Sequence, residues 1–179
     1  PFQEVLLLDA DNVPVVDPEF LFTTPQYKTT GAIFWPDRGR LASSRKIWQL
    51  CGVPFRDEPE IESGQILVDK KRCWEPLKLC MWYNENSDFF YRHIHGDKET
   101  FHLAFRKLEK PYSMPAQGIR LLRHTFCQHD FDGRSIFQHR NGAKWDIFAN
   151  ERIEGFEHED TCLEFIARLR GIWDGRMGH

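Results

Sequence analysis

Two aspartates separated by one residue follow an apolar run near the start of the chain. The run covers residues 5–8, the aspartates are Asp9 and Asp11, and Pro14 follows shortly after. An unbroken apolar run is typical of a strand buried on both faces of a parallel sheet, and proline interrupts strand pairing, so both carboxylates are predicted at the carboxyl end of that strand. Side chains two apart on a strand point the same way, so this pair could share one Mg²⁺ or Mn²⁺ ion, which would in turn neutralise a phosphate. The alternative is an Asp-rich turn, because Asp favours turns and helix caps.

A second polar cluster, residues 60–65, precedes the apolar run 66–68. Gly64 lets the backbone approach a ligand closely, and Glu62 and Gln65 offer hydrogen-bond acceptors that suit hydroxyl groups. The alternative is a solvated acidic loop before a strand, because charged runs are normally exposed.

Two further clusters lie later in the chain. Asp97 stands at the start of a predicted helix, where it either caps the helix or faces a ligand. The segment 139–145 places His139, a possible metal ligand, and Lys144, a possible phosphate-binding cation, on either side of Gly142, which permits a tight turn. Taken alone, His139 also suits a structural role in the core or on the surface.

The elements that must position these clusters alternate between strand-like and helical patterns, as in an α/β domain. Strands are predicted at residues 5–8, 32–35, 66–68, 121–126 and 135–138, and those at 5–8 and 66–68 are expected to be buried. Helices are predicted at residues 19–22, 44–50, 74–81, 101–108 and 162–173. Asp17 and Pro18 indicate the start of the first helix, and Gly52 indicates the end of the second.

Composition indicates one domain over residues 1–179, since 41% hydrophobic and 14% aromatic residues can form a substantial core. A net charge of -3 argues against nucleic acid as a partner, and no apolar stretch approaches the roughly 20 residues of a membrane span. The five cysteines are scattered without a Cys-x-x-Cys pair, which indicates buried thiols with at most one disulfide and no zinc site. Because the chain begins with Pro1, we expect a fragment of a longer protein.

The motifs together resemble the fungal-type α-mannosyltransferase family, whose Golgi members extend mannan and whose relatives include bacterial proteins. The resemblance runs from Leu7 to about Trp145 and is carried by residues 7–22, the segment 31–37 ending in Trp-Pro-Asp, Glu-Ser-Gly-Gln at 62–65 and Gly-Asp-Lys-Glu-Thr-Phe at 96–101. A more distant similarity links the chain to retaining glycosyltransferases of the GT-A fold, such as glycogenin. Those enzymes bind Mn²⁺ with an Asp-x-Asp pair and a late histidine, and a His-x-x-Gly-x-x-Lys-Pro-Trp motif places its lysine on the donor diphosphate. Here one residue fewer separates Gly142 from Lys144, and no proline precedes Trp145, so this motif matches less closely.

The resemblance implies a GT-A-like fold, an open, mostly parallel sheet flanked by helices. GT-A enzymes place nucleoside-binding strands before the Asp-x-Asp strand, and only eight residues precede it here, so those strands are expected to be missing or reduced. The implied metal ligands for Mn²⁺ (or Mg²⁺) are Asp9, Asp11 and His139. The implied donor-binding residues are Asp9, Asn12, Gln65, Gly142 and Lys144. The implied catalytic residues are Asp97, Lys98 and Glu62.

The implied activity is retaining transfer of a hexose, mannose first, from a nucleotide sugar such as GDP-mannose to a hydroxyl of a carbohydrate or glycoconjugate acceptor. A fungal enzyme of this kind would work in the Golgi lumen and a bacterial one in the cytoplasm. Two other classes stay open. A haloacid-dehalogenase-like phosphohydrolase would use Asp9 as nucleophile and Asp11 as acid/base, but it needs a later acidic pair and leaves His139 unexplained. A non-catalytic carbohydrate-binding protein would need no metal.

Overall fold

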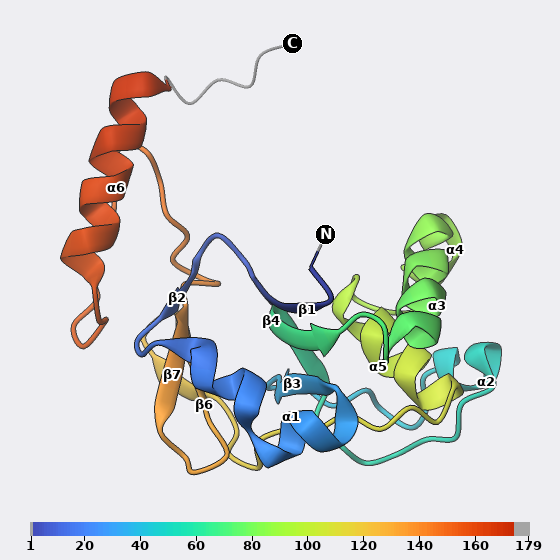
Figure 1. Cartoon of the computed structure of the whole chain (residues 1–179). Coiled ribbons are helices and arrows are strands. Elements are labelled where there is room, and N and C mark those ends of the chain that lie inside the picture. Colours follow the sequence, from blue (N-terminus) through green and yellow to red (C-terminus); the bar gives the residue numbers. More distant parts are fainter. Residues whose placement is uncertain (1, 174–179) are drawn as a thin grey trace.

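A computed structural model describes residues 2–173 and contains two antiparallel sheets (Figure 1). The first sheet has the strand order β1-β4-β3 and the second the order β2-β7-β6-β5. The strands of the first sheet are β1 (Glu4–Leu8), β3 (Ala32–Pro36) and β4 (Ile61–Asp69). Those of the second are β2 (Asn12–Pro14), β5 (Arg120–Leu122), β6 (Thr125–His129) and β7 (Ser135–His139). The chain therefore passes from the first sheet to the second within the few residues that separate β1 from β2.

The mixed α/β composition is confirmed, but the expected mostly parallel sheet is not found, because every pair of named strands among the described residues is antiparallel. An apolar run does not indicate strand direction. β3 is buried along its whole length although it pairs antiparallel, since the second sheet covers one of its faces and helices cover the other. The expectation that residues 5–8 are buried on both faces is wrong, because they belong to an edge strand in which Leu7 is exposed and the other three residues are half-buried.

Each predicted helix has a counterpart in the structure. The helices are η1 (Pro18–Thr23, a 3-10 helix), α1 (Pro25–Thr30), α2 (Ile47–Cys51), α3 (Trp74–Glu85), α4 (Ser87–Phe90), α5 (Lys98–Lys107) and α6 (Glu159–Ile172). Asp17 caps η1 by accepting a hydrogen bond from the Glu19 backbone amide (3.0 Å), and Gly52 ends α2 in the left-handed conformation, as predicted. The short helices α1 and α4 were not predicted.

Two strand predictions change in the structure. The strand expected at residues 121–126 is a hairpin, β5 and β6, which turns at Arg123 with a φ of 51°. Pro14, expected to stop strand pairing, is the last residue of β2. Since β2 lies at the edge of its sheet, a proline there can face away from the neighbouring strand.

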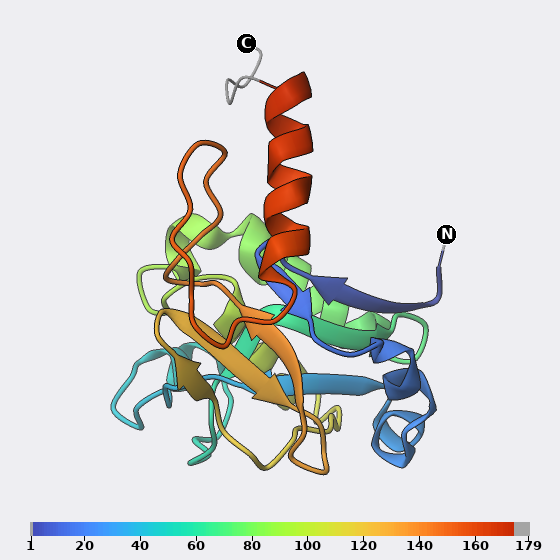
Figure 2. The same ribbon diagram turned by 90° about the vertical axis from the view of Figure 1, so that its left-hand side faces the viewer.

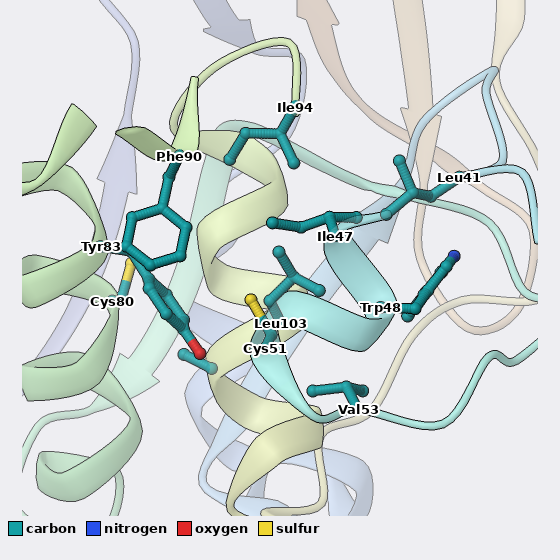
Figure 3. Packing of buried hydrophobic residues seen from close by; sticks show 11 residues of the cluster. Leu41, Ile47, Trp48, Cys51, Val53, Cys80, Tyr83, Phe90, Ile94 and Leu103 are labelled. Atoms are coloured by element: carbon teal, nitrogen blue, oxygen red, sulfur yellow. The ribbon is translucent and has the colours of Figure 1, made fainter. Parts of the chain in front are cut away.

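The core lies in two layers. Between the sheets, the ring of Trp35 packs edge-on against Phe137 with ring centroids 5.3 Å apart, and its indole N–H donates to the His129 carbonyl (2.9 Å). On the other face of β3, Phe34 packs against Phe105 of α5. Figure 3 shows a further cluster where side chains of α2, α3 and α5 converge, among them Leu103. These layers fix β3, β4 and β7 relative to one another.

Helix α6 stands away from the body of the molecule (Figure 2). Its first residue, Glu159, is the buried anchor, and Phe165 and Ile172 are exposed. No helix within residues 2–173 is long and apolar enough to cross a membrane. All five cysteines are free, so the single disulfide that the sequence allowed is not formed.

Candidate metal and sugar-transfer site

The Asp-x-Asp motif lies in a tight turn where the two sheets meet. The Asp9 amide donates to the Gly64 carbonyl of β4 (3.0 Å), and the Asn12 amide donates to the Asp9 carbonyl (3.0 Å). β2 then pairs with β7 so that Asn12 stands opposite His139. The aspartates converge because of this turn and this pairing, and not through strand alternation as expected.

The side chains of Asp9, Asp11 and His139, which we call the metal cluster, offer ligand atoms that all lie within 4.8 Å of one another. The Nε2 atom of His139 is 3.1 Å from Asp11 Oδ1 and 3.8 Å from Asp9 Oδ2. His139 is buried, whereas Asp9 is 52% exposed, so the cluster opens on its Asp9 side. Two carboxylates and an imidazole form a donor set that suits Mn²⁺ and, less well, Mg²⁺.

Lys144 places a positive charge beside the metal cluster. Its Nζ lies 2.5 Å from Asp11 Oδ2, and its side chain is otherwise exposed. Burial alone would raise the pKa of Asp11, but Lys144 and His139 outweigh it and hold the pKa of Asp11 below its usual value. The hydrogen bond to Asp11 in turn raises the pKa of Lys144. The predicted proximity of Asp9, Asp11, His139 and Lys144 is therefore seen in the structure.

Glu62 and Gly64 lie behind the His139 ring. Glu62 Oε1 accepts a hydrogen bond from the Gly64 amide (2.9 Å) and is 3.7 Å from His139 Nδ1. Burial raises the pKa of Glu62. A Cβ atom at position 64 would come within 2.5 Å of the ring, so only glycine leaves room for the imidazole.

Asn12 and Gln65 form a buried amide network beside the metal cluster. The Asn12 side chain donates to the Gly64 carbonyl (2.7 Å) and to Gln65 Oε1 (2.6 Å), and Gln65 is fully buried. This network ties the Asp-x-Asp turn to β4. Gly142 is exposed, and its amide donates to the His124 carbonyl (3.1 Å), which holds the Lys144 loop against the β5–β6 hairpin. Contacts of these three residues with a donor stay a prediction.

Lys98 belongs to a separate set of charges on α5. Its Nζ pairs with Asp37, which follows β3, and with Glu60 Oε2 (3.0 Å). Burial would lower the pKa of Lys98, but these two carboxylates outweigh it and raise the pKa. Asp37 and Lys98 also act electrostatically on Glu62, so this set lies near the metal cluster. Asp97, in contrast, is exposed and makes no side-chain hydrogen bond to cap α5.

One and two helical turns beyond Lys98, His102 and Arg106 extend these charges along α5. His102 Nε2 is 2.8 Å from Glu58 Oε1, and Arg106 Nε donates to the same oxygen (2.7 Å). We call Lys98, His102 and Arg106 with their acidic partners the α5 ion-pair row. Asp37 and Glu60 lie in segments that the sequence analysis named and Glu58 does not, but their pairing with these cations was not predicted. Three basic side chains at four-residue intervals do indicate one charged helix face.

Arg140 is a further residue that the sequence did not single out. It is 1% exposed, its guanidinium donates to the Ala143 carbonyl (2.7 Å) and to Glu159 Oε1 (2.9 Å), and it stacks 3.9 Å above the Trp145 ring. These contacts shape the loop that carries Lys144 and anchor the start of α6. The only sequence signal was the arginine directly after the candidate ligand His139.

Comparison with known proteins identifies the family to which this chain is related. A family model described as putative mannosyltransferases matches residues 1–57 and 55–139, a range that includes the whole metal cluster. An alpha-1,2-mannosyltransferase of Candida albicans is 30% identical over 94% of this chain and 32% of its own length. A second one from that organism is 28% identical over 76% of the chain and 28% of its own length. One from Saccharomyces cerevisiae is 24% identical over 77% of the chain and 33% of its own length. The chain thus spans about a third of these relatives. By the match to the family model, it belongs to this family of mannosyltransferases.

Proposed function

We propose that this protein transfers mannose from a nucleotide sugar, GDP-mannose, to a hydroxyl of a carbohydrate acceptor, with retention of the anomeric configuration. The observation that carries the proposal is the metal cluster, in which two carboxylates and an imidazole from distant segments converge. Family membership supports the mannosyl group, since the relatives named above are mannosyltransferases. A GT-A-like fold is part of the proposal.

The metal cluster would hold Mn²⁺ (or Mg²⁺) through Asp9, Asp11 and His139. Such an ion neutralises the negative charge that a leaving nucleoside diphosphate acquires. Lys144 supports the same assignment, because its ammonium group is 69% exposed and has Asp11 as its partner. A diphosphate bound at the open side of the cluster would offer Lys144 a second anionic partner.

The sugar side of the site is assigned to Asp97 and Lys98. Asp97 is exposed and free of a capping bond, so its carboxylate is available to orient a sugar hydroxyl or to stabilise an oxocarbenium-like centre. Lys98 keeps Asp37 and Glu60 in place beside it. Donor binding would also depend on Asn12, Gln65 and Gly142, because they hold the Asp-x-Asp turn and the Lys144 loop in place.

A titration of the full-length protein with a panel of nucleotide sugars tests the proposal. In the presence of Mn²⁺ we expect one preferred donor, GDP-mannose, and a product in which the anomeric configuration is retained. Asp132→Asn serves as the matched control for site variants, because Asp132 is an exposed aspartate paired with Arg134 in the turn at the far end of β7. Hydrolysis of p-nitrophenyl phosphate would instead favour a phosphohydrolase. Metal-independent binding of free sugars without transfer would favour a carbohydrate-binding protein.

A further inference from the structure

The two nitrogens of the His139 ring have different surroundings. Nε2 faces the two aspartates of the metal cluster. Nδ1 points the other way, is buried and has no hydrogen-bond partner. Buried polar atoms are nearly always paired, so an unpaired ring nitrogen in a candidate site calls for a physical explanation.

Glu62 is the acidic group that Nδ1 faces. Its Oε1 lies 3.7 Å from Nδ1, slightly beyond a hydrogen bond, and is fixed in place by the Gly64 amide. The Glu62 side chain is only 11% exposed, so it does not stand at the open side of the metal cluster where Asp9 and Lys144 lie. Gly64 completes the slot, since any Cβ there would collide with the ring.

We infer that Glu62 is a positioning residue: it accepts a hydrogen bond from the Nδ1–H group of His139 and so directs the Nε2 lone pair toward the metal ion, while Gly64 provides the space for the ring. The inference rests on the proposed metal site. A metal-binding imidazole commonly donates its second N–H to a carboxylate, which fixes the tautomer and the ring orientation. This role differs from the contact with the sugar that the resemblance implied for Glu62.

The test measures the affinity of the full-length protein for Mn²⁺ by electron paramagnetic resonance, without donor or acceptor. Glu62→Gln should weaken Mn²⁺ binding by about 10- to 100-fold, the usual cost of removing such a partner. Glu60→Gln is the matched control, because Glu60 is a similarly buried carboxylate two residues away that pairs with Lys98. The control should bind Mn²⁺ as the wild type does. Melting temperatures of both variants show whether each remains folded.

A double-mutant cycle separates positioning from simple charge. If Glu62 acts through the imidazole, Glu62→Gln should cause no further loss of Mn²⁺ affinity once His139→Ala is present. In the Glu62→Gln variant, the affinity for Mg²⁺ should also fall less than the affinity for Mn²⁺, because Mg²⁺ binds mainly through the carboxylates. An equal loss in the presence and absence of His139 would overturn the inference, since Glu62 would then act by its charge or as a direct ligand.

Gly64→Ala provides an independent check, because its added methyl group must displace the His139 ring. We expect a loss of Mn²⁺ affinity like that of His139→Ala, whereas Gly118→Ala, where a Cβ meets nothing within 4 Å, should change nothing. Normal Mn²⁺ binding by Glu62→Gln or Gly64→Ala beside a binding-competent wild type would refute the positioning role alone. Absence of Mn²⁺ binding by the wild type would refute the metal-dependent function and this inference together.

Discussion

The metal cluster and the α5 ion-pair row are both sets of charges drawn from distant segments, yet they differ in how far they are closed. Lys98 and its two partners are 25%, 10% and 6% exposed, and each charge has an opposite charge beside it. In the metal cluster, Asp9 is half exposed, and Lys144, which lies beside the cluster, contacts Asp11 from the solvent side. Closed, mutually paired charges hold elements together, whereas open carboxylates in excess of their cations are available to an incoming ion.

The largest expected effect is that of Asp11→Asn on transfer. Loss of this carboxylate removes charge that the cation needs, so we expect turnover to fall by more than about a hundredfold, comparable to removing a strong electrostatic stabiliser. The fold should persist because Asp11 lies in a turn outside the packed strands. Turnover at saturating Mn²⁺ and the melting temperature are the two measurements, with Asp132→Asn as control. Near-normal turnover would show that the motif is only a structural turn.

Lys98→Met, in contrast, should reduce the stability of the protein. It leaves Asp37 and Glu60 without their cation at a largely buried position, and we expect a loss of about 2 kcal/mol in the free energy of unfolding. Lys144→Met, which removes an exposed lysine, should cost less than about 1 kcal/mol. Urea unfolding of both variants measures the difference. Equal losses would contradict the distinction between a closed row and an open cluster.

Asp97→Asn tests whether Asp97 contacts the sugar or only stands at the start of α5. Asn is as good a helix cap as Asp, and the Asp97 side chain makes no capping bond, so the melting temperature should not change. If Asp97 contacts the sugar, turnover should fall by about tenfold or more, in the range of a lost catalytic carboxylate. Unchanged turnover in the full-length enzyme would remove Asp97 from the catalytic residues.

The smallest expected effect is a change in the pH dependence of stability. Burial alone would raise the pKa of Glu58, but His102 and Arg106 outweigh it and lower the pKa to about 2, from an ordinary value of 4.5. Because the folded-state pKa is the lower one, this contribution is complete above pH 4.5 and is lost as the pH falls toward 2. The wild type should lose stability between pH 6 and pH 3. In the Glu58→Gln variant this loss should be smaller by about 1 kcal/mol.

Urea unfolding at the two pH values provides the measurement for Glu58→Gln. Asp57→Asn is the matched control, because Asp57 is an adjacent, exposed carboxylate that pairs with exposed Arg40. It should leave the pH dependence as it is in the wild type. A Glu58→Gln variant with the same acid sensitivity as the wild type would show that the row does not depend on Glu58 in its ionised form.

The sequence by itself determined several ends of helices and strands and the chemical types at the site. Pro36 ends β3, Gly52 ends α2 and Asp17 caps η1, because each acts through its own backbone or the next turn. The candidate ligands Asp9, Asp11 and His139 were named from residue type, motif and family resemblance, and their convergence needed only that the two segments meet. Caps and strand ends of this kind depend on interactions between residues that are close in the sequence, and the chemical type of a ligand is given by the residue itself.

Only the tertiary structure decided how the strands pair and which charges become partners. Strand direction depends on how the connections run, and an apolar run such as 5–8 has the same composition in either direction or at an edge. The pairing of Asn12 with His139 joins residues far apart in the chain. In the same way, Lys98 has Asp37 and Glu60 within reach only after α5 packs beside β4. Glu62 likewise faces His139 because β4 and β7 come together around Gly64, an arrangement that no local pattern encodes, since it depends on packing between two sheets.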